Sequence, residues 1–158
     1  MPERAQATIV RNNVFKKSGR PSPDGNRPNL LVGGFPEEGA GSNDLYQIYG
    51  NLLIDNPREA LFQGSGRISF HDNVLIGGEP AAAVFRDHDL PLKLAEVFDN
   101  KIYSPHTGIE FDSAARQGQS VFGNVIFAET PIAGLGRGES GNIVFEPVRA
   151  SERSASPQ

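Results

Sequence analysis

Cysteine is absent from this chain of 158 residues, and long apolar runs are absent as well. Without cysteine, disulfides and thiolate metal sites are both excluded, and the redox state of the compartment stays open. No stretch approaches the roughly 18 consecutive apolar residues of a membrane span. Residues 1–11 also lack the charged and then apolar order of a secretory signal, so we expect any export signal to lie outside this sequence.

Blocks of like charge are also missing from the sequence. The formal net charge of −4 is spread along the chain, which argues against a nucleic-acid-binding stripe or a polybasic membrane anchor. Hydrophobic residues make up only 37% of the chain, whereas 18 glycines and 12 prolines predict frequent turns. The length suits one domain with a substantial core.

The sequence does contain a repeated turn-and-strand unit, as in YGNLLIDN, HDNVLIGG, FDNKIYSP and FGNVIFAE. An asparagine holds the same place in each unit, and the full set is Asn13, Asn51, Asn73, Asn100 and Asn124, with a weaker match at Asn142. The residue before each of the first five is Asn, Gly or Asp, the types that tolerate a backbone with φ above zero. Each pair therefore predicts a turn.

Two apolar columns accompany the asparagines. Three residues earlier stand Val10, Ile48, Phe70, Val97 and Val121, and two residues later stand Phe15, Leu53, Leu75, Ile102 and Ile126. Two such columns cannot both face solvent without creating a large exposed patch. We predict that these residues line the interior, with exceptions in the end coils.

The spacing of the asparagines identifies the fold class. Successive intervals are 38, 22, 27 and 24 residues, which excludes the longer helical repeats and leaves leucine-rich repeats or a parallel β-helix. The LxxLxL spacing is missing, and a second strand such as EALFQG, AAVFRD or GIEFDS follows each turn. The sequence therefore predicts an all-β parallel β-helix of about five to six coils. Its strands would stack at roughly 4.8 Å, and its asparagines would form a structural ladder.

The predicted β-helix covers residues 1–148, with a loop of residues 16–44 inserted into its first interval. Within that loop, NLLVGG at 29–34 echoes NLLIDN and indicates a further strand. A loop this long is often functional, and a disordered insertion is the alternative. Residues 149–158 lack large apolar side chains and are expected to be a disordered tail.

The segments IVRNNVF, IYGNLLIDN, ISFHDNVLI, EVFDNKIYS and VFGNVIF resemble the right-handed parallel β-helix repeat proteins of the pectate-lyase-like superfamily. The resemblance spans roughly residues 7–146. It implies a right-handed solenoid that binds or cleaves polysaccharide, at the cell surface or outside the cell. It also implies more coils than are countable here, so we expect missing upstream coils or self-association at the coil ends.

The densest polar cluster is FRDHDLP, which contains Arg86, Asp87 and His88. The next coil should place Glu110 and Asp112 beside it in register. Together these residues could bind an acidic sugar, hold Ca²⁺ or act as an acid and base, and the alternative is an ordinary solvated turn. No catalytic residue can be assigned, because the calcium-binding and arginine pattern of pectate lyases has no match in this chain.

Two aspartates, Asp72 and Asp99, share one column and are candidate Ca²⁺ ligands, with simple solvation as the alternative. His71 and His106 lack the spacing of a zinc site, and no cofactor is required by any motif. Three functions stay open: a carbohydrate-binding or carbohydrate-cleaving domain, a structural or adhesive β-helix, and an inactive C-terminal fragment of a larger enzyme.

Overall fold

The protein is described by a computed structural model that covers residues 6–21, 23–33, 37–38, 41–115 and 117–147. These residues form strands and turns, and no helix among them is long and apolar enough to cross a membrane. The expected tail at 149–158 lies outside the described residues. All strand pairs are parallel, and they build three sheets, which we call A, B and C.

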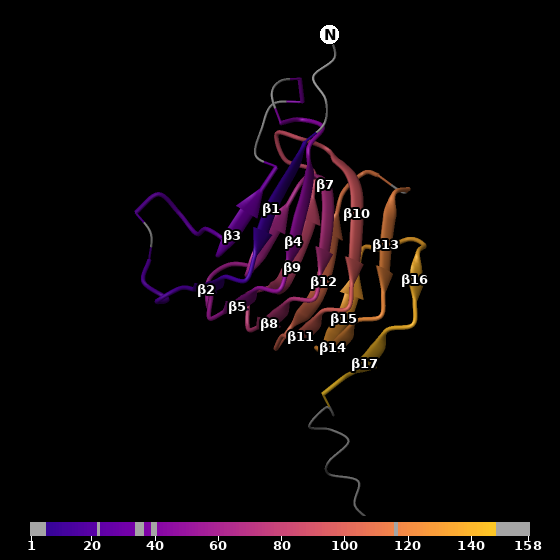
Figure 1. Cartoon of the computed structure of the whole chain (residues 1–158). Helices are drawn as coiled ribbons and strands as arrows, with labels where there is room; N and C mark the ends of the chain where they lie inside the picture. Colours follow the sequence, from indigo (N-terminus) through magenta and orange to yellow (C-terminus); the bar gives the residue numbers. More distant parts are fainter. Residues whose placement is uncertain (1–5, 22, 34–36, 39–40, 116, 148–158) are drawn as a thin grey trace, which may run out of the picture.

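The three sheets take their strands in turn along the chain (Figure 1). Sheet A contains β1 (Ala7–Arg11), β4 (Leu45–Tyr49), β7 (Gly66–His71), β10 (Leu92–Phe98), β13 (Gln119–Phe122) and β16 (Glu139–Ser140). Sheet B contains β2 (Val14–Lys16), β5 (Leu52–Ile54), β8 (Val74–Ile76), β11 (Lys101–Tyr103), β14 (Val125–Phe127) and β17 (Ile143–Phe145). Sheet C contains β3 (Leu30–Val32), β6 (Phe62–Gly64), β9 (Ala81–Arg86), β12 (Thr107–Asp112) and β15 (Thr130–Ala133).

Each strand pairs with the strand one coil before and one coil after it, which is the defining arrangement of a parallel β-helix. Ile48 on β4 pairs with Phe70 on β7, and Phe70 pairs with Val97 on β10, so the predicted column is a physical row. Sheets A and B hold six strands each and sheet C holds five. The predicted fold class and coil number are confirmed.

A left-handed residue turns the chain from sheet A into sheet B in every coil. The φ angles are 58° at Asn12, 64° at Gly50, 51° at Asp72, 54° at Asp99, 66° at Gly123 and 63° at Gly141. Only a short list of residue types adopts this conformation readily, which explains why the column is restricted to Asn, Asp and Gly. The predicted turn column is confirmed.

The asparagine after each left-handed residue forms a continuous hydrogen-bonded ladder. The Nδ2 atom of Asn73 donates to Oδ1 of Asn100 at 3.1 Å, and its backbone N–H donates to the same oxygen at 3.0 Å. Nδ2 also donates to the carbonyl of Ile48 in the preceding coil at 2.9 Å. Equivalent Nδ2 to Oδ1 bonds link Asn13 to Asn51, Asn51 to Asn73, Asn100 to Asn124 and Asn124 to Asn142. The ladder therefore extends to the weaker sixth match.

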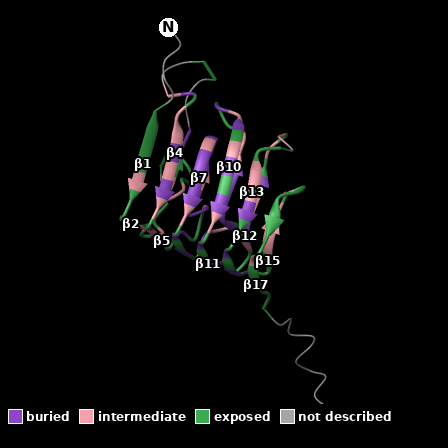
Figure 2. Cartoon of the chain, turned by 45° about the vertical axis from the view of Figure 1, so that its right-hand side comes forward, coloured by how far each residue is buried: buried purple, intermediate pink, exposed green. Residues whose placement is uncertain are grey.

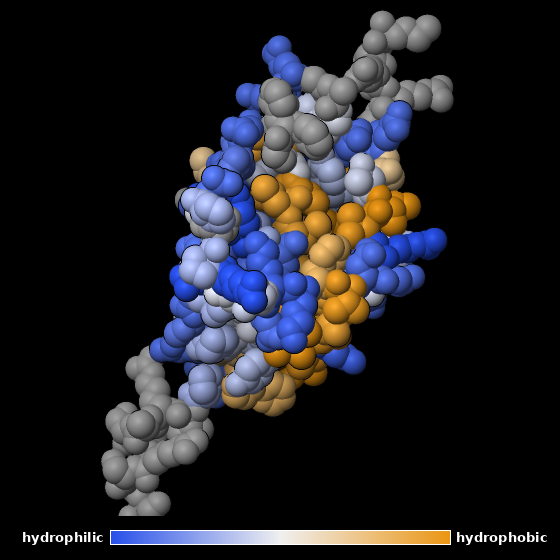
Figure 3. Space-filling model, turned by 90° about the vertical axis from the view of Figure 1, so that its left-hand side faces the viewer, coloured by the Kyte–Doolittle hydropathy of each residue, from blue (hydrophilic) through white to orange (hydrophobic). Residues whose placement is uncertain are grey.

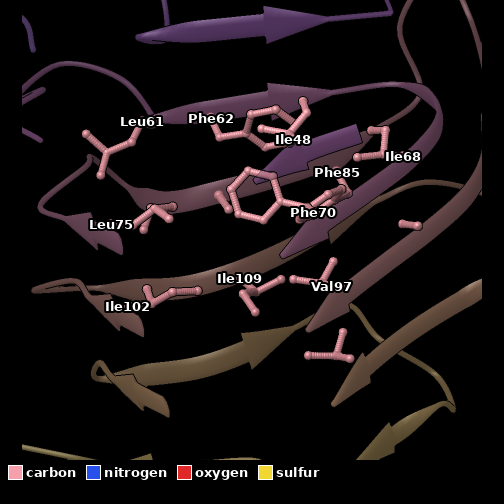
Figure 4. Packing of buried hydrophobic residues seen from close by; sticks show 14 of the residues in the cluster. Ile48, Leu61, Phe62, Ile68, Phe70, Leu75, Phe85, Val97, Ile102 and Ile109 are labelled. Atoms are coloured by element: carbon pink, nitrogen blue, oxygen red, sulfur yellow. The ribbon is translucent and has the colours of Figure 1, made fainter. Parts of the chain in front are cut away.

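The interior holds the two predicted apolar columns (Figure 4). Eight of the ten residues are at most 3% exposed, and Val10 and Phe15 of the first coil are partly buried. Phe62 from sheet C packs against Phe70 and Phe85 with ring centroids 4.5 and 5.4 Å apart. Burial is greatest in the middle coils, and the first strand of sheet A is mostly exposed (Figure 2).

The first coil is closed by a strand inside the long interval between Asn13 and Asn51. The strand expected at NLLVGG is present as β3, and it pairs with β6 in sheet C. The interval is therefore divided into a segment between β2 and β3 and another between β3 and β4. Viewed from this end, apolar side chains gather in the middle of the surface, with hydrophilic side chains on both sides (Figure 3).

We predict that replacing Asn73 by Leu lowers the free energy of unfolding by about 1–3 kcal/mol, because a buried turn loses its hydrogen-bond partners. Urea denaturation of the variant and the parent measures the change. Asn43, which is exposed and outside the ladder, gives a matched control as Asn43→Leu. Equal stability of the Asn73 variant and the parent would show that the ladder is incidental.

A second prediction concerns the left-handed column. Gly123→Ala should destabilise the protein by about 1–2 kcal/mol, because φ is positive there and an added Cβ would lie 2.5 Å from Oδ1 of Asp99. Gly136→Ala is the control, since an added Cβ there meets no atom within 4 Å. Thermal melts that rank the two variants in the opposite order would contradict this account.

Candidate ligand-binding groove

The segment between β2 and β3, which we call the first-coil loop (residues 17–29), is anchored by a pair of asparagines. Nδ2 of Asn56 donates to Oδ1 of Asn29 at 2.9 Å and to the carbonyl of Arg27 at 3.0 Å. Asn29 in turn donates to the carbonyls of Phe15 and Ile54. Because Asn56 is only 4% exposed, these bonds are shielded from water and fix the base of the loop.

Long cationic side chains also hold the loop. Nζ of Lys17 donates to the carbonyl of Arg27 at 2.8 Å, and Nε of Arg58 donates to the carbonyl of Gly19 at 3.2 Å. Gly19 has φ of 74°, and an added Cβ would lie 3.1 Å from the ring of Pro57. The loop is thereby held against the turn that follows β5, where Asn56 and Arg58 lie.

A cavity of about 420 Å³ lies between this loop and the outer face of sheet C. Its lining residues are Asn26, Arg27, Pro28, Leu31, Glu59, Gln63, Arg86 and His88. They include guanidinium, amide and imidazole groups, and the half-exposed side chain of Leu31 supplies an apolar contact. Two of the predicted site residues, Arg86 and His88, therefore line a concave surface.

A second cavity of about 480 Å³ shares Asn26 and Arg27 with the first. Its lining contains five cationic residues and no carboxylate: Lys16, Lys17, Arg20, Arg27 and Arg58. A third cavity of about 560 Å³ shares Lys16, Lys17 and Asn56 with the second and continues to Asp55 and Glu79. We call the three adjoining cavities the loop groove.

The loop groove is positively charged although the whole chain carries a formal charge of −4. Lys16 forms an ion pair with Asp55 at 3.2 Å, but both side chains are more than half exposed, so this pair leaves much of the charge accessible to a ligand. A concave surface lined by cations concentrates the local potential and attracts anions. The groove therefore suits an anionic ligand.

Register brings Arg86 beside Asp112, as the sequence predicts. The two residues are paired on β9 and β12, and NH2 of Arg86 lies 3.3 Å from Oδ2 of Asp112. Nε of Arg86 is buried and makes no hydrogen bond to any of the residues that the structure describes. Glu110 is paired with Val84 and lies on the outer face of sheet C, two residues before Asp112 on the same strand and away from the lining of the groove.

Asp87 is directed into its own loop and not toward the groove. Oδ1 accepts bonds from the Leu92 N–H and the Ser113 hydroxyl, both at 2.8 Å, and Oδ2 accepts the Ala114 N–H at 2.9 Å. Burial by itself raises the pKa of Asp87, but these hydrogen bonds outweigh it and hold the pKa below its ordinary value. The carboxylate organises the turns after β9 and β12.

The remaining candidate residues lie elsewhere on the surface. Oδ2 of Asp72 lies 2.7 Å from Nδ1 of His71, and Asp72 and Asp99 both occupy left-handed turn positions. Within the described ranges, no group of three or more His, Asp or Glu side chains gathers as a metal site. Nδ1 of His88 lies 3.4 Å from Oδ2 of Asp89 at the rim of the sheet C cavity.

Sequence reasoning missed the cations that the loop contributes. Arg27 and Arg58 carry no repeat signal, and they meet only because the loop folds back onto the turn after β5. Asn56 and Asn29 form a second, shorter asparagine pair between neighbouring coils. Two residues are too few to be recognised as a repeat in the sequence. The one available signal was the local excess of Lys and Arg in KKSGR at residues 16–20.

The fold and the groove define a parallel β-helix with a cationic surface channel at its first coils. Searches against protein families, curated proteins and solved structures each found no match.

The state of Asp87 predicts how stability depends on pH. Because its folded pKa is depressed, its contribution is present above the unfolded pKa of about 3.9 and is lost as the pH falls through the folded value. Asp87→Asn should cost about 1–2 kcal/mol at neutral pH, since the amide Nδ2 cannot accept the Ala114 N–H. Urea denaturation from pH 7 to pH 3 should show the gap closing in acid, and a constant gap would contradict the assignment.

Proposed function

We propose that this protein binds an acidic carbohydrate in the loop groove. The observation that carries the proposal is the cation-lined concavity formed by the first-coil loop, in a chain whose overall charge has the opposite sign. Anionic groups are recognised by guanidinium and ammonium donors, and Arg offers two parallel bonds to one carboxylate. The resemblance to polysaccharide-binding β-helices supports the same ligand class.

The sheet C cavity supplies the other contacts that a sugar needs. Gln63 and Asn26 present amide donors and acceptors for hydroxyl groups, and Glu59 presents a carboxylate that accepts hydroxyl protons. Leu31 offers an apolar surface to the C–H face of a ring. Arg27 belongs to this cavity and to the cationic cavity, so one chain of sugar residues can contact both.

The position of Arg86 fits it for a uronate or another anionic sugar substituent. Its ion pair with Asp112 is more than a third exposed on both sides. An incoming carboxylate can therefore bind the guanidinium at the cost of a weak surface pair. His88 lies next to it at the rim and provides a further hydrogen-bond donor.

We expect calcium to bridge the sugar and the protein and not to be a resident cofactor. Ca²⁺ prefers six to eight oxygen ligands, and an acidic sugar brings carboxylate oxygens of its own. Asp112, which lies beside Arg86, is the carboxylate of the predicted site from which such a bridge could start, whereas Glu110 lies away from the groove. Binding should then be stronger with calcium than without it. Asp72 and Asp99, on another corner, would bind calcium without affecting the sugar.

Titration with acidic oligosaccharides, with and without calcium, tests the proposal. We expect amide chemical shifts to change at Arg86, His88 and the first-coil loop. Arg27→Ala and Arg86→Ala should each weaken binding about tenfold, as expected for loss of one charge-assisted contact. Arg137→Ala removes an exposed cation outside the groove and should leave the affinity unchanged.

Two outcomes would count against this function. If no acidic oligosaccharide shifts any resonance, the structural alternative stands in its place. If all three arginine variants weaken binding equally, the interaction is attraction by bulk charge and the groove has no special part in it. Raising the salt concentration distinguishes binding in the groove from attraction by bulk charge, because bulk attraction is screened over about 10 Å at 0.1 M salt.

A further inference from the structure

The outer face of sheet B differs in chemistry from the other two sheets. Every strand of this sheet has three residues, and the first and third point away from the core. These outward residues are Val14, Leu52, Val74, Lys101, Val125 and Ile143 in one column, and Lys16, Ile54, Ile76, Tyr103, Phe127 and Phe145 in the other. Ten of the twelve are apolar, and we call this surface the sheet B face.

The apolar side chains of the sheet B face are accessible and not merely near the surface. Ile76 is 45% exposed, Tyr103 is 52% exposed and Phe127 is 37% exposed, although all three lie in the middle coils. A shallow cavity of about 260 Å³ opens among β8, β11 and β14 and is lined by Val74, Ile76, Tyr103, Val125 and Phe127, together with Lys101 and two core residues. Figure 1 shows these strands along the lower side of the molecule.

The sheet B face is also regular. All its strand pairs run in unbroken register from β2 to β17, whereas the pairing of β7 with β10 in sheet A contains an irregularity. The rings of Tyr103 and Phe127 stack with centroids 5.2 Å apart and planes 13° apart. A surface that is already ordered loses little side-chain entropy when another surface packs on it.

The other two sheets present more polar side chains outward. Sheet A shows Gln47, Ser69, Glu96 and Ser120 next to the core column, in line with Ile9, and it also carries an outward column of stacked rings. Sheet C shows Gln63, Arg86, Glu110 and Asp112. The contrast means that the apolar character of the sheet B face is not a general feature of this solenoid. Flat apolar sheet faces pack against each other about 10 Å apart in β-sandwiches, which places a similar sheet as the natural partner.

The extent of the face is adequate for a stable contact. Eight of its apolar residues are exposed by between 36% and 68%. If a large apolar residue presents about 150–200 Å² when fully exposed, these eight present on the order of 700 Å². A standard protein interface buries about 800 Å² on each partner. A second copy of this chain therefore offers enough matching surface, and polar rim residues would complete it.

Charge favours one orientation of two copies. Lys16 lies on β2 at one end of the face and is more than half exposed although it pairs with Asp55, and Glu146 directly follows β17 at the other end. When two faces pack with their solenoid axes antiparallel, the Lys16 end of one copy lies over the Glu146 end of the other. Lys101 is the one other charged residue on the face, and its long stem can pack flat while its ammonium group reaches the edge.

We propose that the protein forms a twofold-symmetric dimer through its sheet B face, with the solenoid axes antiparallel. The inference rests on the sheet B face and not on the carbohydrate proposal, although Lys16 at one end of that face also lines two cavities of the loop groove. The rest of the groove lies over sheet C and over the turn after β5, so two copies would present two sites to one long ligand. Such a bivalent arrangement raises apparent affinity for a repeating polymer.

Sedimentation equilibrium of the full chain, from low micromolar to near-millimolar concentration, tests the proposal. The parent should approach twice 17.0 kDa. Ile76→Glu places a charge in the centre of the face and should weaken the dimer on the order of a hundredfold. Ile9→Glu is the matched control, because Ile9 is 52% exposed on β1 of sheet A, and it should dimerise like the parent.

Each other result overturns the proposal. A parent that stays monomeric at all concentrations has no such interface. An open-ended series of masses would mean that the coil ends associate head to tail, as a heterologous contact does. If Ile9→Glu weakens the dimer as much as Ile76→Glu does, the sheet B face is not the specific interface. Thermal melts accompany these measurements, and both variants should unfold like the parent monomer, because both substituted side chains point outward.

Discussion

The asparagine ladder is the interaction on which the rest of this structure depends. Each turn from sheet A into sheet B buries backbone groups that water cannot reach, and in the inner coils one amide side chain satisfies at least two of them. Asn100 shows the arrangement: it donates to Oδ1 of Asn124 and to the carbonyl of Phe70, and its own oxygen accepts from the side chain and backbone of Asn73. Because the bond runs from one coil to the next, the ladder also aligns the coils, and this alignment determines every other column.

Because the coils are aligned, residues at equal positions form columns on the outer surface. The side chains of one column can share the same polarity along the whole molecule. The sheet B face is apolar because the same two positions are apolar in almost every coil. The loop groove arises in the opposite way, from a departure from the repeat, since the first coil alone carries the long segment between β2 and β3. Asn29 and Asn56 hold that segment in place with the same amide chemistry as the main ladder, over only two coils.

The stacked rings on sheet A illustrate how alignment also limits function. Tyr49, His71, Phe98 and Phe122 lie in one outward column, with successive centroids 4.9, 4.6 and 4.9 Å apart and planes within 8° of parallel. Each ring covers the face of the next, so the ring faces inside the stack are occupied by their neighbours, whereas Leu31 in the groove keeps its apolar surface free of such stacking.

By itself, the sequence determined the parts of this protein that repeat. The five ladder asparagines, the left-handed residue before each of them and the eight fully buried column residues follow from spacing and residue type, because stacked coils place equal sequence positions in equal surroundings. It also placed Glu110 and Asp112 in the coil next to Arg86, and the register pairs Asp112 with Arg86. Only the tertiary structure decided where Arg27 and Arg58 lie and that Asp87 faces Leu92 and Ala114 instead of a ligand. Those positions depend on the path of non-repeating loops, which is set by contacts between residues distant in sequence and leaves no period to read.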